Sequence, residues 1–412
     1  MVPALTAKKT VRAVFSSFLS SRSILRHHKH PTRENTWQSL IFVLVSIPFA
    51  LIAFPVLLIR RIFRQPVHVT VLATEGEFGP FMNLMEFMRG EPRKPREILF
   101  VLAKKRHVTF AGIYRREINR PIFWSNGVSG FFQQAVLLQP SLLVVAKRLT
   151  PVVANRMPTH PVRVDPELEK MRTQLLTQLG CNSTKLVAMA VHTTQYDDEA
   201  NGRYASKEAS RESKGAELAV AIDYLSGQNV DVVLLGAADT RASRIPRDIP
   251  RLSDFGQHGG PQEVAIASGC TYFWTDDVGA WWLAVPFGKP VLFTNFTRIL
   301  IRRGVQPRGH LVVPARYETL DGRRLTFEEI LATRSPTYKA ASRGELRLIR
   351  NSPEELLEGH REMISRLDGT WKEDDESRDL RVRLEKIFSR YEEWHPLNVS
   401  SFFLKRHPYL LD

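Results

Sequence analysis

The 412-residue sequence lacks the marks of several common protein classes. Its two cysteines, Cys181 and Cys270, are too few for a disulfide-stabilised secreted domain and do not have the spacing of zinc ligands. The GxGxxG, Walker A, HExxH and nucleophile-elbow motifs are absent. Their absence argues against dinucleotide enzymes, P-loop NTPases, zinc proteases and typical α/β-hydrolases.

Acidic residues are nearly absent from the first 64 residues. This segment has ten lysines and arginines but one acid, Glu34, so +9 of the formal net charge of +15 lies there. The basic residues flank a hydrophobic stretch, an arrangement that favours attraction to anionic lipid headgroups. Because no basic run marks the rest of the chain, nucleic acid is not an expected partner.

A segment without any charged residue runs from Leu40 to Ile59. Twenty residues of helix span about 30 Å, the thickness of the hydrocarbon core, so the segment predicts a membrane anchor. Both flanks are basic, and the positive-inside rule therefore does not fix the orientation. Since Pro48 and Pro55 can kink a helix, a re-entrant monotopic anchor and a kinked single span are both open.

Beyond the anchor, short apolar strands alternate with helices, which indicates an α/β fold with parallel sheets. The second half shows this most clearly, with predicted strands at 186–191, 230–235, 270–274 and 290–294 and helices at 215–225, 261–268 and 280–285. We predict five parts: a basic segment (1–35) that is either an amphipathic helix or a disordered tail, the anchor (36–64), an N-terminal Rossmann-like domain (65–165), a C-terminal Rossmann-like domain (166–365), and a C-terminal helix and tail (366–412).

Ligands in open α/β sheets bind outside the carboxyl ends of the strands. His192 follows one such strand and could act as a base or donate to a phosphate, although a structural histidine is the alternative. The long polar loop 195–213 ends with Arg211 and Ser213. Its arginine could bind an anion through two nitrogens or simply be solvated.

The turn Thr275–Gly279 follows the predicted strand 270–274 and opens the predicted helix 280–285. Free backbone amides at such a helix start form a natural phosphate cradle. Asp276 and Asp277 would repel a diphosphate, however, and they suit a sugar hydroxyl better. Two adjacent aspartates are weak evidence for a metal site.

Six stretches of the sequence carry a family resemblance in their order and spacing. They read KLVAMAVHTTQY, RESKGAELAVAIDYL, VDVVLLG, FWTDDVGAWWLAVPFGKPVLFTNF, HLVVPARYETLDGRRLTFEEIL and SSFFLKRHPYLL. Together they resemble a family of bacterial glycosyltransferases of the surface-polysaccharide type, distantly similar to fucosyltransferases. The resemblance covers residues 185 to 412, with a weaker match at 76–89.

This resemblance implies a GT-B-like fold, in which two Rossmann-like domains face a cleft, and a nucleotide-sugar donor as co-substrate without a metal or other cofactor. Catalysis is assigned to His192 and Arg211. Donor binding is assigned to Ser213, Gly236, Thr275, Asp276, Asp277, Gly279 and Arg316.

The sequence therefore predicts a metal-independent glycosyltransferase attached to the cytoplasmic membrane through residues 1–64, with its body in the cytoplasm. Its acceptor would be a glycan or a lipid-linked glycan. Thr194, Asp276 and Asp277 depart from the family pattern. A non-catalytic sugar- or nucleotide-binding scaffold is therefore the alternative, and a membrane-surface enzyme of lipid metabolism is a third interpretation that the anchor alone favours.

Overall fold

The computed structural model describes residues 68–73, 89, 97–102, 122–125, 161–191, 215–236, 249–255, 260–276, 279–297, 300–302, 309–333, 340–341, 343–390 and 394–412. No helix within these ranges is long and apolar enough to cross a membrane. The predicted anchor at 36–64 lies outside them. The chain forms two compact units, one with strands β1 to β3 and one with every described element from residue 161 onward. The domain boundaries at 65, 166 and 366 remain predictions.

The first unit contains a three-stranded parallel sheet in the order β1-β2-β3. Its strands are β1 (His68–Ala73), β2 (Glu97–Leu102) and β3 (Ile122–Ser125). The first two coincide with short apolar runs of the sequence. The parallel pairing agrees with the parallel sheets expected from the sequence.

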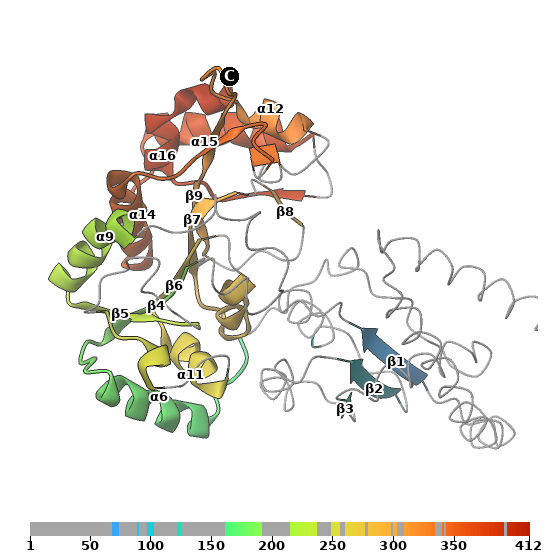
Figure 1. Ribbon diagram of the computed structural model, residues 1–412, viewed down its shortest axis with the longest axis vertical. Coiled ribbons are helices and arrows are strands. Elements are labelled where there is room, and N and C mark those ends of the chain that lie inside the picture. Colours follow the sequence, from blue (N-terminus) through green and yellow to red (C-terminus); the bar gives the residue numbers. More distant parts are fainter. Residues whose placement is uncertain are drawn as a thin grey trace, which may run out of the picture. The chain divides into compact units, whose positions relative to one another are not determined.

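The second unit is built on a five-stranded parallel sheet in the order β5-β4-β6-β7-β9 (Figure 1). Its strands are β4 (Lys185–Ala190), β5 (Val230–Leu234), β6 (Tyr272–Thr275), β7 (Val291–Phe296) and β9 (Leu311–Pro314). The chain runs from β4 outward to β5 and then returns to the other side of β4 for β6. The strand order therefore reverses between β4 and β6, as in doubly wound folds.

Two pairs of helices cover this sheet (Figure 1). In one pair, α6 (Pro166–Gln178) packs against α11 (Pro261–Gly269), which also contacts β4. In the other, α9 (Gly215–Gly227) packs against α14 (Pro353–Leu367), which also contacts β7 and β9. Every residue of β6 and β7 is buried. Burial on both faces explains why these strands begin as apolar runs in the sequence, although polar residues occupy their carboxyl ends.

Both edges of the five-stranded sheet are covered by short bridges. Leu234 of β5 pairs with Arg251, just before the 3₁₀ turn η4 (Leu252–Phe255). Val312 of β9 pairs with Val399, donating its N–H to the Asn398 carbonyl (2.9 Å) and accepting from the Ser400 amide (2.8 Å). Such coverage keeps unpaired backbone groups from recruiting another strand.

The C-terminal elements cluster beyond the β9 end of the sheet (Figure 1). They comprise the helices α12 (Phe327–Ala332), α15 (Asp375–Phe388) and α16 (Ser401–Arg406), the turn η7 (Pro408–Leu411), and the antiparallel pairs β10 (Arg316–Glu318) with β11 (Arg347–Ile349) and β8 (Leu300–Arg302) with β12 (Trp394–Pro396). Phe388, Phe403 and Leu410 are all buried there. The tail that reads as aromatic and basic in the sequence is thus part of a packed core.

The expected helix at 280–285 is wrong. The chain instead forms two 3₁₀ turns, η5 (Gly279–Leu283) and η6 (Val285–Phe287). Pro286 cannot donate a backbone hydrogen bond and disfavours the α conformation in the residue before it. The rings of Trp281 and Trp282 stack with centroids 4.3 Å apart, which fixes the first turn.

Candidate ligand site at the carboxyl edge of the sheet

The carboxyl ends of β4 and β6 are neighbours at the point where the strand order reverses. Ala190 at the end of β4 pairs with Thr275 at the end of β6. In open α/β sheets the crevice at such a point is where ligands bind. The β4 side continues through Val191 to His192, which lies outside the described residues, and the β6 side continues to Asp276.

The end of β6 is buried and tied to its neighbour β7. Thr275 is completely buried and Asp276 is 2% exposed. The Thr275 hydroxyl donates to the Asp276 carbonyl (2.7 Å), while Thr294 of β7 donates to the Thr275 carbonyl (3.5 Å) and accepts from the Trp274 indole (3.0 Å). Hydrogen bonds within the protein therefore occupy the Thr275 side chain and fix the position at which Asp276 leaves the strand.

Gly236 lies two residues after the end of β5 in a conformation that favours glycine, with φ +98°. Its N–H donates to the Glu263 carboxylate (2.9 Å), which comes from the first turn of α11 and is buried. A Cβ at this position would meet no atom within 4 Å, so the backbone angle and not space requires glycine. The Gly236 amide is thus engaged inside the protein.

Gly279 begins η5, which has five residues and no α-helical turn. The aligned peptide dipoles of a full α-helix, which would favour a phosphate at this position, are therefore not formed in the described structure. The preceding Asp277 lies outside the described residues, as do His192, Arg211, Ser213 and Thr194.

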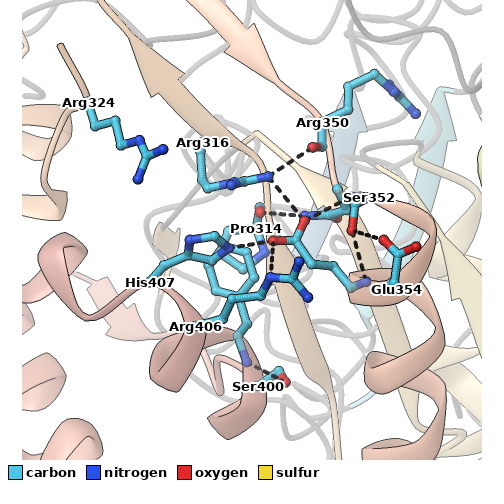
Figure 2. A network of polar contacts seen from close by, with 12 residues as sticks. Pro314, Arg316, Arg324, Arg350, Ser352, Glu354, Ser400, Arg406 and His407 are labelled. Carbon is cyan, nitrogen blue, oxygen red and sulfur yellow. Dashed lines mark hydrogen bonds and ion pairs between the residues drawn. The ribbon is translucent and has the colours of Figure 1, made fainter. Parts of the chain in front are cut away.

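Arg316 lies at the start of β10, two residues after β9 ends (Figure 2). Its Nη2 donates to the Arg350 carbonyl (3.2 Å) and to Glu355 (3.1 Å). The arginine side chain is 15% exposed and the glutamate side chain 1%. Arg316 therefore joins the edge of the sheet to the start of α14, and its charge is balanced by a buried carboxylate.

Figure 2 shows a polar network around Arg316 and His407 that the sequence analysis did not identify. Its hydrogen bonds make Glu355 the centre of this network. Glu355 accepts from the Ser352 amide (2.8 Å), from Arg316 and from the His407 ring, and Arg406 lies 3.9 Å away. Burial alone would raise the pKa of Glu355, but the bonds from His407 and Ser352 and the charge of Arg316 outweigh it, so the pKa is lowered. The sequence pattern S-x-x-E at 352–355 is typical of a capping box and could have predicted the contact between Ser352 and Glu355.

Asn295 and Asn351 form a reciprocal pair beside this network. The Asn295 amide donates to Asn351 Oδ1 (2.5 Å), and the Asn351 amide donates to Asn295 Oδ1 (2.6 Å). Asn351 Nδ2 donates to the Pro314 carbonyl at the end of β9 (2.9 Å). The pair therefore holds the carboxyl ends of β7 and β9 against the start of α14.

The structure thus brings Gly236, Thr275 and Asp276 to one edge of the sheet and places Arg316 farther along, past β9. Among the described residues, no group of three or more histidines, cysteines, aspartates and glutamates could hold a metal ion. Both cysteines are buried, and burial is the main cause that raises the pKa of Cys181 to about 11 and of Cys270 to about 12.

No protein-family model matches the chain, and no curated protein matches it either. The chain is, however, similar to several solved structures. They include a glycosyltransferase family 9 protein from Veillonella parvula DSM 2008 (10% identity, TM-score 0.46, 73% of this chain and 98% of that chain). Another is the E. coli ADP-heptose LPS heptosyltransferase II (12% identity, TM-score 0.44, 73% and 100%). A third is the dodecameric iron-containing heptosyltransferase TibC in complex with ADP-D-β-D-heptose (13% identity, TM-score 0.38, 73% and 78%).

All three are glycosyltransferases. At these scores the similarity assigns neither an activity nor a residue role to this chain.

Proposed function

We propose that the protein is a glycosyltransferase that transfers a sugar from a nucleotide-sugar donor to a glycan or lipid-linked acceptor. The observation that carries this proposal is the reversal of strand order between β4 and β6. In doubly wound sheets, nucleotides bind in the crevice at such a point. The two chain segments that leave these strands are those in which the sequence resemblance places His192 and the turn at 275–279.

The reaction proposed is a direct displacement at the anomeric carbon of the donor. The acceptor hydroxyl oxygen forms the new glycosidic bond, while the bond between the anomeric carbon and the diphosphate oxygen breaks. The hydroxyl proton passes to a base, for which His192 is the candidate, and the nucleoside diphosphate leaves with the electron pair. Arg211 stabilises the negative charge of the diphosphate.

The buried carboxylate at the end of β6 supports a sugar as the transferred group. Asp276 is 2% exposed, and a carboxylate at this position repels a diphosphate but accepts hydrogen bonds from hydroxyl groups. Arg316 already has a carboxylate partner in Glu355, so its predicted contact with the donor would require it to use its remaining nitrogens.

The membrane part of the proposal rests on the sequence. Residues 1–64 would attach the enzyme to the cytoplasmic face of the membrane through the segment 40–59 and its basic flanks. An enzyme held there would meet lipid-linked acceptors directly.

Donor binding by the full-length chain tests the proposal. ADP-heptose, UDP-glucose and GDP-mannose, with the matching nucleoside diphosphates, would be screened for the rise in unfolding temperature that they produce. A ligand at a hundredfold excess over its dissociation constant stabilises the native state by about 2.7 kcal/mol. We expect one nucleotide sugar to stabilise the protein, and we expect Arg211→Ala to abolish the effect while the surface variant Arg378→Ala, on the exposed side of α15, keeps it. A folded protein that responds to none of them would contradict the proposal.

A non-catalytic scaffold that binds the same ligands is the second candidate. Two observations favour it: the Gly236 amide is bound to Glu263, and η5 replaces the expected helix start, so fewer backbone donors could stabilise the charge that develops on a leaving diphosphate. Release of nucleoside diphosphate from the bound nucleotide sugar in the presence of a membrane glycan fraction separates the two. Tight binding without any release identifies the scaffold.

A further inference from the structure

Where β7, β9 and the start of α14 meet, some buried hydrogen-bond donors of the described residues lack an acceptor. We use the name joint for Asn295, Pro314, Arg316, Arg350 and Asn351. Arg316 and Asn295 hold consecutive residues of one segment, since the guanidinium donates to the Arg350 carbonyl and the Asn295 side chain accepts from the Asn351 amide. Both side chains therefore converge on the start of α14.

Two buried donors in this joint have no acceptor. Neither Asn295 Nδ2 nor Arg316 Nε has a hydrogen-bond partner in the part of the chain that the structure describes. Asn351 does not supply one: its Oδ1 accepts from the backbone N–H of Asn295, and its Nδ2 is itself a donor to the Pro314 carbonyl. The joint thus lacks an oxygen acceptor, whereas nearly all buried polar groups in native proteins have a partner.

The backbone of Asn295 adds a second, independent sign. Its φ is +49°, in the left-handed region that asparagine adopts more readily than most non-glycine residues, at a break in register between β7 and β9. Asn295 is also 3% exposed. Such a departure from regular strand geometry turns the Asn295 side chain away from the strand pattern at the carboxyl edge of the sheet, where ligands bind in open α/β sheets.

Charge decides which kind of acceptor fits. Arg316 is paired with Glu355, whose side chain is 1% exposed, and the Asp276 carboxylate at the end of the neighbouring strand β6 would repel a phosphate beside this joint. The missing acceptor is therefore a neutral oxygen. A sugar hydroxyl suits it, because its oxygen can accept from an amide while its hydrogen is donated to a carboxylate such as Asp276, which leaves the neighbouring strand β6.

We propose that Asn295 is a sugar-binding residue whose Nδ2 donates to a hydroxyl oxygen of the transferred sugar, with Arg316 Nε as a second donor at the same joint. The inference rests on the proposed function and adds a residue that the family resemblance does not assign. It also narrows the expected role of Arg316 in donor binding, because the part of the donor that Arg316 would contact is the sugar.

Asn295→Asp tests the inference with little change in shape. Aspartate keeps the oxygen that accepts from the Asn351 amide and tolerates the left-handed conformation, but it replaces the donor with an acceptor. The dissociation constant of the full-length protein would be measured for the nucleotide sugar that stabilises it and for the matching nucleoside diphosphate. We expect Asn295→Asp to weaken nucleotide-sugar binding about tenfold and to leave diphosphate binding unchanged.

Asn351→Asp is the matched control, since it removes the donor to Pro314 within the same joint. We expect it to lower the unfolding temperature without favouring one ligand over the other. Asn295→Gly, which accepts the positive φ and lacks the whole side chain, replaces Asn295→Asp if the latter does not fold.

The outcomes separate this inference from the proposed function. A wild-type protein that binds neither ligand overturns the glycosyltransferase proposal and this inference with it. A wild-type protein that binds the nucleotide sugar, with Asn295→Asp binding it equally well, leaves the function standing and overturns the role of Asn295. Equal weakening for both ligands also overturns it, because the residue would then not recognise the sugar.

Discussion

The Glu355 network gives the sharpest test of what stabilises the second unit. We consider Glu355→Gln, which keeps the helix cap because glutamine serves equally at the fourth position of a capping box. What it removes is the negative charge that faces Arg316 and His407. The glutamine amide would place a donor against one of these two donors, and the guanidinium would lose its only carboxylate partner within the described residues.

The expected loss follows from burial. Removing one partner of a buried ion pair costs about 3–5 kcal/mol, because the other charge stays buried without compensation. Arg316 is 15% exposed and glutamine retains one acceptor oxygen, so we expect about 2–4 kcal/mol. For a unit of this size the unfolding temperature would fall by about 5 °C or more.

The chain provides a matched control in Glu329→Gln. Glu329 occupies the same position of the capping box that begins α12, and its partner Arg323 is 57% exposed. Exposed pairs contribute about 0–1 kcal/mol, so this variant should unfold within about 2 °C of the wild type. Thermal unfolding followed by circular dichroism measures both. Equal shifts for the two variants would refute the argument that burial of the Arg316–Glu355 pair matters.

The pH dependence provides a second check on the same residue. The pKa of Glu355 is lowered in the folded protein, so its stabilisation is present above the ordinary carboxyl pKa of 4.5 and is lost as the pH falls through the folded value. The stability difference between wild type and Glu355→Gln should therefore shrink below about pH 4.5. A difference that stays constant down to pH 3 would contradict this assignment.

Two further predictions concern α14. Burial lowers the pKa of His360 from 6.5 to about 3, and its Nδ1 bonds with the Tyr272 hydroxyl (2.6 Å). Below pH 6.5 His360 takes up a proton in the unfolded chain but not in the folded protein. The free energy of unfolding of the wild type should therefore fall by about 1.4 kcal/mol per pH unit down to about pH 3 because of this residue. Denaturant titrations at several pH values should show this fall in the wild type and not in His360→Gln. At Gly359, an added Cβ would lie 2.7 Å from Val313 Cγ2. Gly359→Ala should therefore destabilise the protein by about 1 kcal/mol despite the better helix propensity of alanine, whereas Gly227→Ala, with nothing within 4 Å, should be neutral or stabilising in the same assay.

The sequence was sufficient to locate most of the sheet in the second unit. Strands β4, β5 and β7 and helices α9 and α11 lie within one or two residues of their expected positions, because fully buried strands are short apolar runs bounded by glycine or proline. The α-helix expected at 280–285 does not form, because Pro286 lacks a backbone donor and disfavours the α conformation in the residue before it.

Sequence patterns could not identify the Glu355 network or the Asn295–Asn351 pair. Glu355 is 39 residues from Arg316 and 52 from His407, and Asn295 is 56 from Asn351. No local spacing relates such pairs. Only the packing of α14 and the C-terminal segment against the end of the sheet brings them together. The capping box at 352–355 shows where α14 begins but not which distant side chains its glutamate would meet.

The coverage of the outer strand β9 also bears on synthesis of the protein. Val312 receives its edge partner from Val399, which the ribosome adds much later. At 5–20 residues per second, the backbone groups of β9 have no native neighbour on that side for roughly 5–20 s. During that interval β9 is an unpaired edge of the kind that can pair with a strand of another chain, and the segment around Val399 closes it only near the end of synthesis.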